Sequence, residues 1–216
     1  MVGKIKSKIY KKITEIVGKE IAKIEQNLPS LELNQIHFDN LRVLKNRESL
    51  LNELPKNGIV AELGVDKGGF SQMILEINHP QKLHLIDSWN TERYHSGLKI
   101  KVEERFSKEI SNESVVIHQG FSTDFAENFP NSYFDWIYID TDHSYQTTKN
   151  ELLLYKDKIK PGGIIAGHDF VKGNMQKQIR YGVLEAVYEF CFNENWEFVF
   201  LTMEMNNNPS FAIRKI

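Results

Sequence analysis

Residues 134–143 read Phe134-Asp135-Trp136-Ile137-Tyr138-Ile139-Asp140-Thr141-Asp142-His143. The run from Trp136 to Ile139 is large and apolar or β-branched, which is typical of a parallel strand covered on both faces. Asp140, Asp142 and His143 follow at once. Because ligands of open α/β sheets bind beyond the carboxyl ends of the strands, this segment predicts a buried strand that leads ionisable groups into a ligand site.

The composition is that of an ordinary globular domain. Of 216 residues, 41% are hydrophobic and 26% charged, and the net charge of −2 indicates no general attraction to nucleic acid. The single cysteine, Cys191, excludes an internal disulfide framework and fits a reducing compartment. No run approaches the roughly 20 apolar residues of a membrane span, and the basic N-terminus lacks the apolar segment of a signal peptide. We expect a cytoplasmic protein without a nucleic-acid partner and without stable membrane insertion.

Residues 1–55 are expected to form a helical extension that precedes a domain of residues 56–216. In residues 1–27, apolar positions recur every three or four residues among seven lysines, which predicts an amphipathic helix. Such a helix could bind a membrane surface or a partner. It could also pack on the domain or on a second copy of the chain, as a homodimer, and its three glutamates favour this packing. A break at Leu28-Pro29-Ser30 precedes a second predicted helix, residues 35–54.

The first core strand is expected at residues 58–64, followed by a glycine-rich turn and a helix over residues 72–78. This order opens a nucleotide-binding βαβ unit. The turn reads Glu62-x-Gly64-x-x-x-Gly68-x-x-Ser71, which is neither the dinucleotide fingerprint nor a triphosphate-binding loop. Gly64 would let a ligand approach the backbone, and Glu62 with Asp66 would repel a phosphate but attract a cation or an amino group. A tight turn without a ligand is the alternative.

The second and third strands also end in polar residues. Residues 82–86 lead into Asp87-Ser88-Trp89, where an acid hydrogen-bonds a ribose diol in such folds, although Asp87 could instead cap the next helix. Residues 114–118 lead into Gln119-Gly120-Phe121-Ser122. There Gly120 and Ser122 could line the edge of a base, and Phe121 could stack on it or belong to the core.

The remaining pattern completes an α/β fold. A helix is predicted over residues 147–158, a turn at residues 160–163, and a short fifth strand at residues 164–166 that ends in Gly167-His168-Asp169. A helix over residues 181–192 and two strands, residues 196–201 and 210–213, follow. The alternation predicts a doubly wound, mostly parallel seven-stranded sheet of the Rossmann-like type.

Taken together, these motifs resemble the class I S-adenosylmethionine-dependent methyltransferases over residues 58–216. The resemblance rests on the acidic glycine turn, the acid after the second strand, the strand of residues 134–140 and the Pro-Gly-Gly before the fifth strand. Asp-Thr-Asp-His-Ser-Tyr and Pro-Gly-Gly-x-x-x-Gly-His-Asp-Phe are similar to the cephalosporin-hydroxylase and macrolide-sugar O-methyltransferase group (methyltransferase domain 24-like). That group is related to the metal-dependent catechol-type methyltransferases.

The resemblance implies a site for S-adenosylmethionine at the carboxyl ends of the first four strands. It implies that the glycine turn lines the amino-acid tail, that Asp87 holds the ribose, and that residues 120–122 lie near the adenine. The cofactor has no phosphate, which suits a turn that carries Glu62 and Asp66. The candidate cofactor-binding residues are Glu62, Gly64, Asp66, Gly68, Ser71, Asp87, Ser88, Gly120, Phe121, Ser122 and Asp140.

The resemblance also implies a catalytic arrangement. A hydroxyl is a poor nucleophile until a divalent cation lowers its pKa or a general base removes its proton. By resemblance, Asp140, His168 and Asp169 would bind the metal, and His143 would be the base, since the ordinary histidine pKa of about 6.5 suits neutral pH. Mg²⁺ or Mn²⁺ is expected ahead of Zn²⁺ or Fe²⁺. However, relatives usually have an acid at position 168, and a nitrogen ligand fits Mn²⁺, Fe²⁺ or Zn²⁺ better than Mg²⁺. Asp142 or water could complete the shell instead, or no metal is bound.

We therefore expect an O-methyltransferase that acts on a small hydroxylated acceptor such as a sugar or a glycosylated metabolite. Two alternatives remain: a metal-independent methyltransferase that uses His143 alone, and a non-catalytic S-adenosylmethionine-binding protein. A dehydrogenase is disfavoured because the dinucleotide glycine pattern is absent. Acceptor specificity is expected in the N-terminal helices and in residues 91–98 and 171–180.

Overall fold

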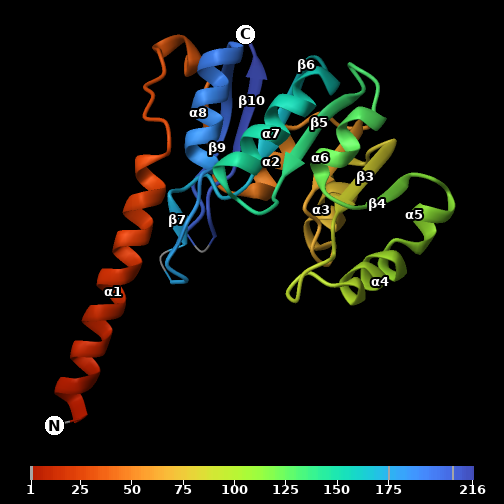
Figure 1. Cartoon of the computed structure of the whole chain (residues 1–216). Helices are drawn as coiled ribbons and strands as arrows, with labels where there is room; N and C mark the ends of the chain where they lie inside the picture. Colours follow the sequence, from red (N-terminus) through yellow and green to blue (C-terminus); the bar gives the residue numbers. More distant parts are fainter. Residues whose placement is uncertain (1, 175, 206) are drawn as a thin grey trace.

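The computed structural model describes residues 2–174, 176–205 and 207–216. Within these residues, eight strands form one sheet in the order β1-β9-β10-β6-β5-β2-β3-β4 (Figure 1). The strand β10 is antiparallel to β6 and β9, whereas the other neighbours pair in parallel. The strands are β1 (Arg42–Leu44), β2 (Ile59–Leu63), β3 (Lys82–Asp87), β4 (Val115–Gln119), β5 (Phe134–Ile139), β6 (Ile159–Gly167), β9 (Trp196–Thr202) and β10 (Phe211–Lys215).

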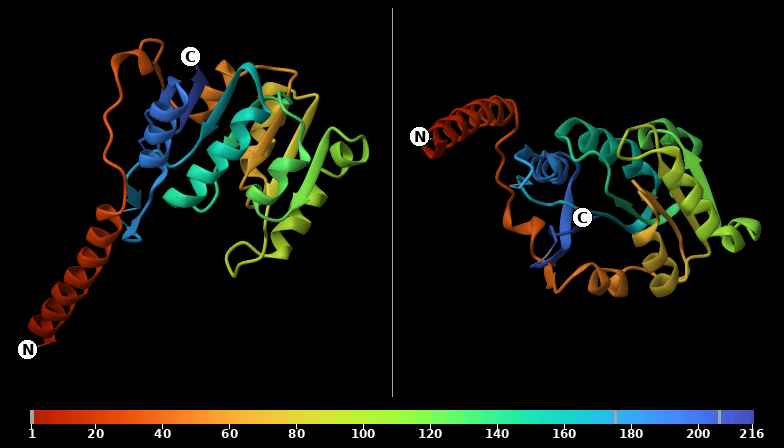
Figure 2. Two further views of the ribbon diagram at one scale, coloured as in Figure 1. Left: turned by 45° about the horizontal axis from the view of Figure 1, so that its top comes forward. Right: turned by 90° about the horizontal axis from the view of Figure 1, so that it is seen from below.

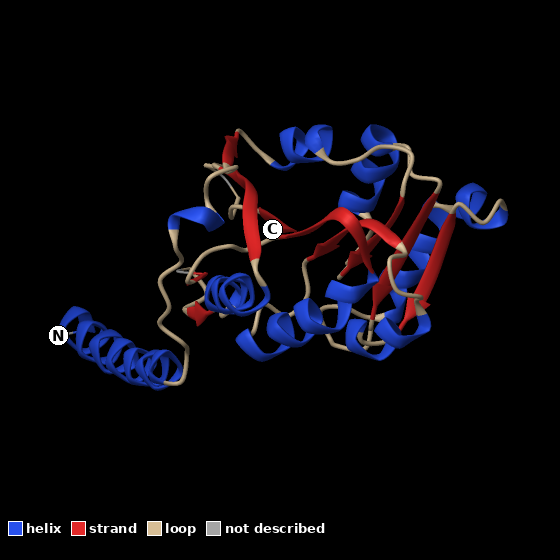
Figure 3. Cartoon of the chain, turned by 90° about the horizontal axis from the view of Figure 1, so that it is seen from above, coloured by secondary structure: helices blue, strands red, loops and turns tan. Residues whose placement is uncertain are grey.

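Helices cover both faces of the sheet (Figures 2 and 3). The hydrophobic core on one face includes residues of α2 and α3, and the core on the other face includes residues of α7 and α8. A small hairpin, β7 (Gly173–Asn174) with β8 (Ile179–Arg180), follows β6. The helices are α1 (Val2–Gln26), α2 (Arg47–Glu53), α3 (Gly69–Asn78), α4 (Ser96–Arg105), α5 (Ser107–Ser111), α6 (Ser122–Phe125), α7 (Tyr145–Tyr155) and α8 (Val183–Glu194).

The central strand β5 is buried on both faces, as its sequence predicts. Trp136 and Tyr138 enter one core, while Ile137 and Ile139 enter the other. All four side chains are at most 4% exposed. The predicted doubly wound, mostly parallel α/β architecture is therefore confirmed.

The segment before β2 differs from its prediction. The helix predicted over residues 35–54 is wrong: a 3-10 turn (Gln35–His37) is followed by β1, which pairs with β9 as an eighth strand, and only then by α2. Asn46 explains the late start of α2, because its side chain accepts a hydrogen bond from Ser49 N at 2.9 Å and so caps the helix. The domain boundary at residue 55 stays a prediction, although Leu50 and Leu51 are fully buried in the core.

Two further boundaries differ. The predicted turn at residues 160–163 belongs to β6, which begins at Ile159 and contains a register shift opposite β5. Gly162 has a φ of 77° there, so an irregularity within the strand replaces the expected turn. The helix predicted over residues 147–158 is α7, which begins at Tyr145 and ends at Tyr155.

The N-terminal helix α1 projects away from the body of the molecule (Figures 1 and 2). It does not pack its apolar stripe on the domain, since Ile9, Ile13 and Ile16 are each about half exposed. Its C-terminal end meets the hairpin, where Arg180 Nε lies 3.3 Å from Glu25 Oε1. Among the described residues, no helix combines the length and the apolar character that a bilayer crossing requires.

Gly64 brings the carboxyl ends of β2 and β5 together. It has a φ of 89°, and a Cβ atom built on it would lie only 2.0 Å from the carbonyl oxygen of Asp140. Asp140 N donates to Leu63 O at 2.7 Å across the same contact. A side chain at position 64 would therefore separate the two strands at the point where both turn toward the carboxyl edge of the sheet.

We predict that Gly64→Ala lowers the free energy of unfolding by about 2–4 kcal/mol, because it adds left-handed backbone strain and overpacking. Gly69→Ala is the matched control, since a Cβ atom at Gly69 meets nothing within 4 Å. Urea denaturation of the two variants measures the difference. Equal free energies of unfolding for the two variants would show that β2 and β5 accommodate a Cβ atom at position 64 without a loss of stability.

Candidate active site

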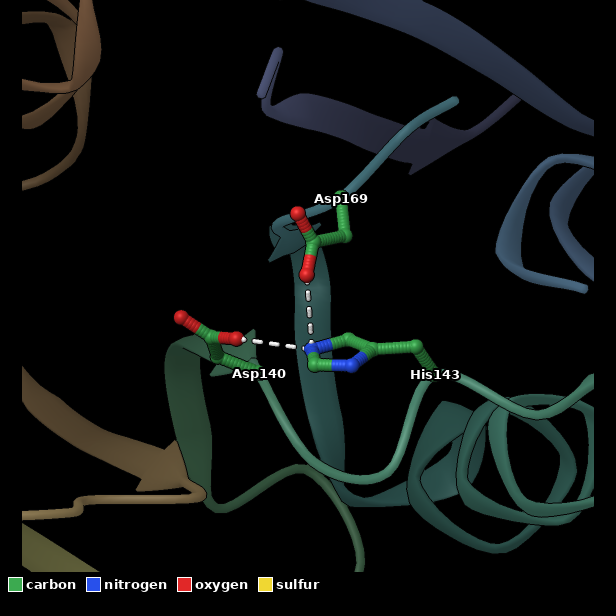
Figure 4. Close-up of side chains that lie close together, drawn as sticks. All are labelled: Asp140, His143 and Asp169. Atoms are coloured by element: carbon green, nitrogen blue, oxygen red, sulfur yellow. Dashed lines mark hydrogen bonds and ion pairs between the residues drawn. The ribbon is translucent and has the colours of Figure 1, made fainter. Parts of the chain in front are cut away.

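Three ionisable side chains converge at the carboxyl ends of β5 and β6 (Figure 4). Asp140 directly follows β5, and Asp169 lies two residues beyond β6. Between the two strand ends, His168 N donates to Ile139 O at 2.9 Å. His143 reaches the same place from the loop before α7, with a left-handed φ of 63°. The adjacency of the strands thus produces the grouping that the sequence pattern predicts.

The His143 ring links the two carboxylates. Its Nε2 atom lies 3.0 Å from Asp140 Oδ1 and 2.9 Å from Asp169 Oδ2 (Figure 4). Burial disfavours the charged imidazolium, but hydrogen bonds to both carboxylates outweigh burial and raise the pKa of His143 from 6.5 to about 9. Burial likewise opposes charge on Asp140, yet its histidine neighbours hold the pKa of its carboxyl group well below the usual range. With only these partners, the ring is positively charged at neutral pH.

The same three side chains have a donor set that fits a divalent cation. One ligand atom from each of Asp140, His143 and Asp169 lies within 4.8 Å of the others. Two carboxylate oxygens and one imidazole nitrogen suit Mn²⁺, Fe²⁺ or Zn²⁺, and the oxygens also suit Mg²⁺. Asp140 and Asp169 were both predicted as ligands, whereas His143 was predicted as the base.

His168, the third predicted ligand, lies beside this group. Its Nδ1 atom is 3.6 Å from Asp140 Oδ2 and 3.4 Å from Asp169 Oδ1. Its Nε2 atom is buried and has no hydrogen-bond partner among the described residues. An imidazole with one unsatisfied nitrogen is unusual in a protein interior, and a metal-binding role for His168 stays a prediction.

Asp142 is not part of the cluster, and its carboxylate binds the start of α7. Its Oδ1 atom accepts from Ser144 N at 2.8 Å, and its Oδ2 atom accepts from Thr147 Oγ1 at 2.8 Å. Both carboxylate oxygens thus have local partners, which is typical of a helix-capping acid. The structure gives Asp142 no contact with the other two aspartates.

Asp87 organises the glycine turn. Its Oδ2 atom accepts from Val65 N at 2.8 Å and from Asp66 N at 3.0 Å, and its Oδ1 atom accepts from Trp89 N at 3.0 Å. The carboxylate therefore fixes the turn after β2 against the end of β3. The predicted ribose contact would use the remaining lone pairs of the same oxygens. The next residue, Ser88, donates to Asn90 Oδ1 at 2.9 Å.

Glu62 is directed into the protein rather than toward solvent. It is 2% exposed, and its carboxyl group accepts a hydrogen bond from Ser71 at the start of α3. Burial is the main cause that raises the pKa of Glu62 from 4.5 to about 8. Glu62 therefore adds little negative charge to this turn at neutral pH. Gly68 has a φ of 75° at the N-terminus of α3, as a tight turn requires.

The loop after β4 is tied to the loop after β5 by a residue that the sequence analysis missed. Glu151 of α7 is fully buried and accepts from Ser122 Oγ on one oxygen and from Thr141 Oγ1, at 3.0 Å, on the other. Burial raises the pKa of Glu151 to about 7. Phe121, one position before Ser122, is 57% exposed and available as a stacking surface. Gly120 precedes it with a φ of 156°.

Three more side chains were not anticipated. Arg47 Nη1 lies 3.7 Å from Asp140 Oδ2, the Tyr181 ring lies 4.9 Å from the His143 ring, and Asn208 Nδ2 donates to Asp169 Oδ1. Arg47 also lies over the ring of Phe70 at 5.1 Å. None of these residues belongs to a motif of the sequence, and each comes from a segment read as a loop or as part of a helix. Only tertiary structure brings them to the cluster.

Solved structures with a similar fold include methyltransferases. The O-methyltransferase from Bacillus cereus, in complex with S-adenosylhomocysteine, is 16% identical with a TM-score of 0.57, and the match covers 93% of this chain and 90% of that one. A protein of Clostridium thermocellum assigned as an rRNA methylase is 12% identical with a TM-score of 0.60, covering 80% of this chain and 97% of that one. These likenesses show that the chain shares its fold with methyltransferases.

The family follows from the sequence itself. A family model described as a methyltransferase domain (family 24) matches residues 61–170, just over half of the chain. The chain belongs to this family and is an S-adenosylmethionine-dependent methyltransferase. No curated protein matches the chain.

The raised pKa of Glu62 predicts a pH-dependent stability. Because the folded state holds the proton more tightly than the unfolded state, the contribution of Glu62 is fully present below about pH 4.5 and is lost as the pH rises through about 8. We predict that Glu62→Gln, which is always neutral, has a flatter dependence over this range. Chemical denaturation of the cofactor-free protein at several pH values measures it. Parallel profiles for the two proteins would mean that Glu62 keeps its ordinary pKa.

Proposed function

We propose that this methyltransferase transfers the methyl group of S-adenosylmethionine to a hydroxyl of a small acceptor, a sugar or a glycosylated metabolite, with a divalent metal and His143 at the reacting oxygen. The observation that carries the proposal is the convergence of Asp140, His143 and Asp169 within 4.8 Å. This cluster stands beside the glycine turn, because Gly64 contacts the backbone of Asp140. A cofactor on the turn and an acceptor on the cluster would thus be neighbours.

The reaction requires one bond to form and one to break. The acceptor oxygen attacks the methyl carbon, the carbon–sulfur bond breaks with its electron pair going to sulfur, and S-adenosylhomocysteine leaves. The proton of the hydroxyl must go to a base, and Nε2 of His143 is the candidate. A divalent cation held by Asp140 and Asp169 would lower the pKa of the hydroxyl.

The charge state of His143 supports a link between the bound metal and the general base. While both carboxylates accept from Nε2, the pKa of about 9 keeps the ring protonated at neutral pH, and a protonated ring cannot accept the hydroxyl proton. If Asp140 and Asp169 held a divalent cation, they would no longer stabilise the imidazolium. The pKa of His143 would then fall to a value suited to a base.

We predict that the chelator-treated protein binds Mn²⁺ and that Asp169→Asn weakens this binding about tenfold or more, since a charged oxygen ligand is lost. Calorimetric titration with Mn²⁺ alone measures it without an acceptor. Asp142→Asn is the matched control, because it removes the same charge two residues from Asp140 but in a carboxylate that accepts from Ser144 and Thr147 at the start of α7. His143→Ala and His168→Ala, titrated in the same way, identify which histidine supplies nitrogen. No Mn²⁺ binding by the unaltered protein would contradict the metal site.

We predict that His143→Ala lowers the rate of methyl transfer about 10²–10⁴-fold, the usual contribution of a general base. The measurement is release of S-adenosylhomocysteine with a panel of hydroxylated acceptors that includes sugars. Binding of S-adenosylhomocysteine should be unchanged in the variant. Full turnover by His143→Ala would remove the proposed base, and turnover that survives chelation would favour a metal-independent enzyme. A protein that binds the cofactor but turns over no acceptor would favour a non-catalytic role.

A further inference from the structure

The helix α1 carries an apolar face that nothing in the described part of the chain covers. Its exposed side chains include Ile9, Ile13, Ile16 and Ile24, at 45–55% exposure, and Tyr10 at 69%. The four isoleucines are spaced by four, three and eight residues, which places them along one side of the helix. With 25 residues, the helix is about 37 Å long.

The charge of α1 is opposite to that of the remaining chain. It contains seven of the 27 basic residues and three of the 29 acidic ones, so the rest of the chain has 20 basic and 26 acidic residues. Lys12, Lys19 and Lys23 follow one edge of the isoleucine face at 3.6 residues per turn. Lysines in such positions can extend their stems over an apolar surface while the ammonium groups reach anionic headgroups.

The width of the apolar face argues against a coiled coil with a second copy. A seam in steps of three and four through Tyr10, Thr14, Val17, Ile21 and Ile24 leaves Ile9, Ile13 and Ile16 outside it, and a seam through these three isoleucines would include Glu20 and Lys23. Two such helices would also bring together two surfaces with the same net positive charge. A broad apolar face bordered by lysines fits a surface that is apolar beneath and anionic above.

We propose that α1 binds an anionic lipid surface, lying in the plane of the interface with its isoleucines among the acyl chains and its lysines at the headgroups. In Figure 1, α1 projects beyond the edge of the sheet at which the β7–β8 hairpin lies. That hairpin follows the carboxyl end of β6, so the cluster of Asp140, His143 and Asp169 lies at the same edge.

The test is co-sedimentation of the full chain with vesicles of phosphatidylcholine containing about one third phosphatidylglycerol, and with vesicles of phosphatidylcholine alone. Binding is expected with the anionic vesicles and is expected to weaken as salt is added. Ile16→Glu should reduce the partition coefficient about tenfold or more, since it removes an apolar side chain that would enter the lipid and adds a negative charge. Ala22→Glu is the matched control: it adds the same charge at an exposed position on the opposite side of α1, and should reduce partition severalfold at most.

Two results would overturn the proposal: no binding of the unaltered chain to anionic vesicles at low salt, or equal losses in Ile16→Glu and Ala22→Glu. Light scattering without lipid can give a third such result. If the unaltered chain is a dimer and Ile16→Glu dissociates it, the apolar face of α1 binds a second copy of the chain instead. Neither substitution touches the buried core, so unchanged binding of S-adenosylhomocysteine confirms that both variants are folded. The vesicle measurement requires no methyl transfer and is therefore independent of the proposed reaction.

Discussion

The close approach of β2 and β5 is the constraint on which the site depends. These two central strands pair in parallel, and their ends are joined by the hydrogen bond from Asp140 N to Leu63 O at 2.7 Å. A residue without a Cβ atom is strongly favoured at position 64, because the carbonyl of Asp140 fills that space. One backbone contact therefore holds the glycine turn, which a cofactor would contact, beside Asp140, the first acid of the ionisable cluster. No flexible segment lies between them.

Electrostatic balance explains how the cluster can exist in a largely buried position. Asp140 and Asp169 would repel each other if both were ionised without a cation between them. The protonated ring of His143 supplies that cation, and Arg47 contributes a second positive charge at 3.7 Å from Asp140. A divalent cation between the two carboxylates would compensate their charge in the same way as the imidazolium does.

The sequence alone predicts the central strands and the acids that follow them, because burial on both faces leaves a continuous apolar run and the strand ends carry the polar residues. β1 was missed because three residues are too few for a periodic signal, and because Arg42 and Val43 are exposed. The roles of Arg47 and Glu151 depend on contacts across the sheet that no local pattern records. The sequence also does not predict that the neutral form of Glu62 is favoured, since this preference arises from complete burial against α3 rather than from the residue type.

The short strand β1 has a consequence for assembly. A free sheet edge presents backbone groups to which a strand of another molecule can add, and the risk grows with the length of the edge. Here the outermost strand has three residues, and the guanidinium of Arg42 is held by both oxygens of Glu53 at 2.9 Å beside it. A neighbouring chain would find few backbone partners and a charged pair in its way. Growth of the sheet from molecule to molecule is thus disfavoured at this edge.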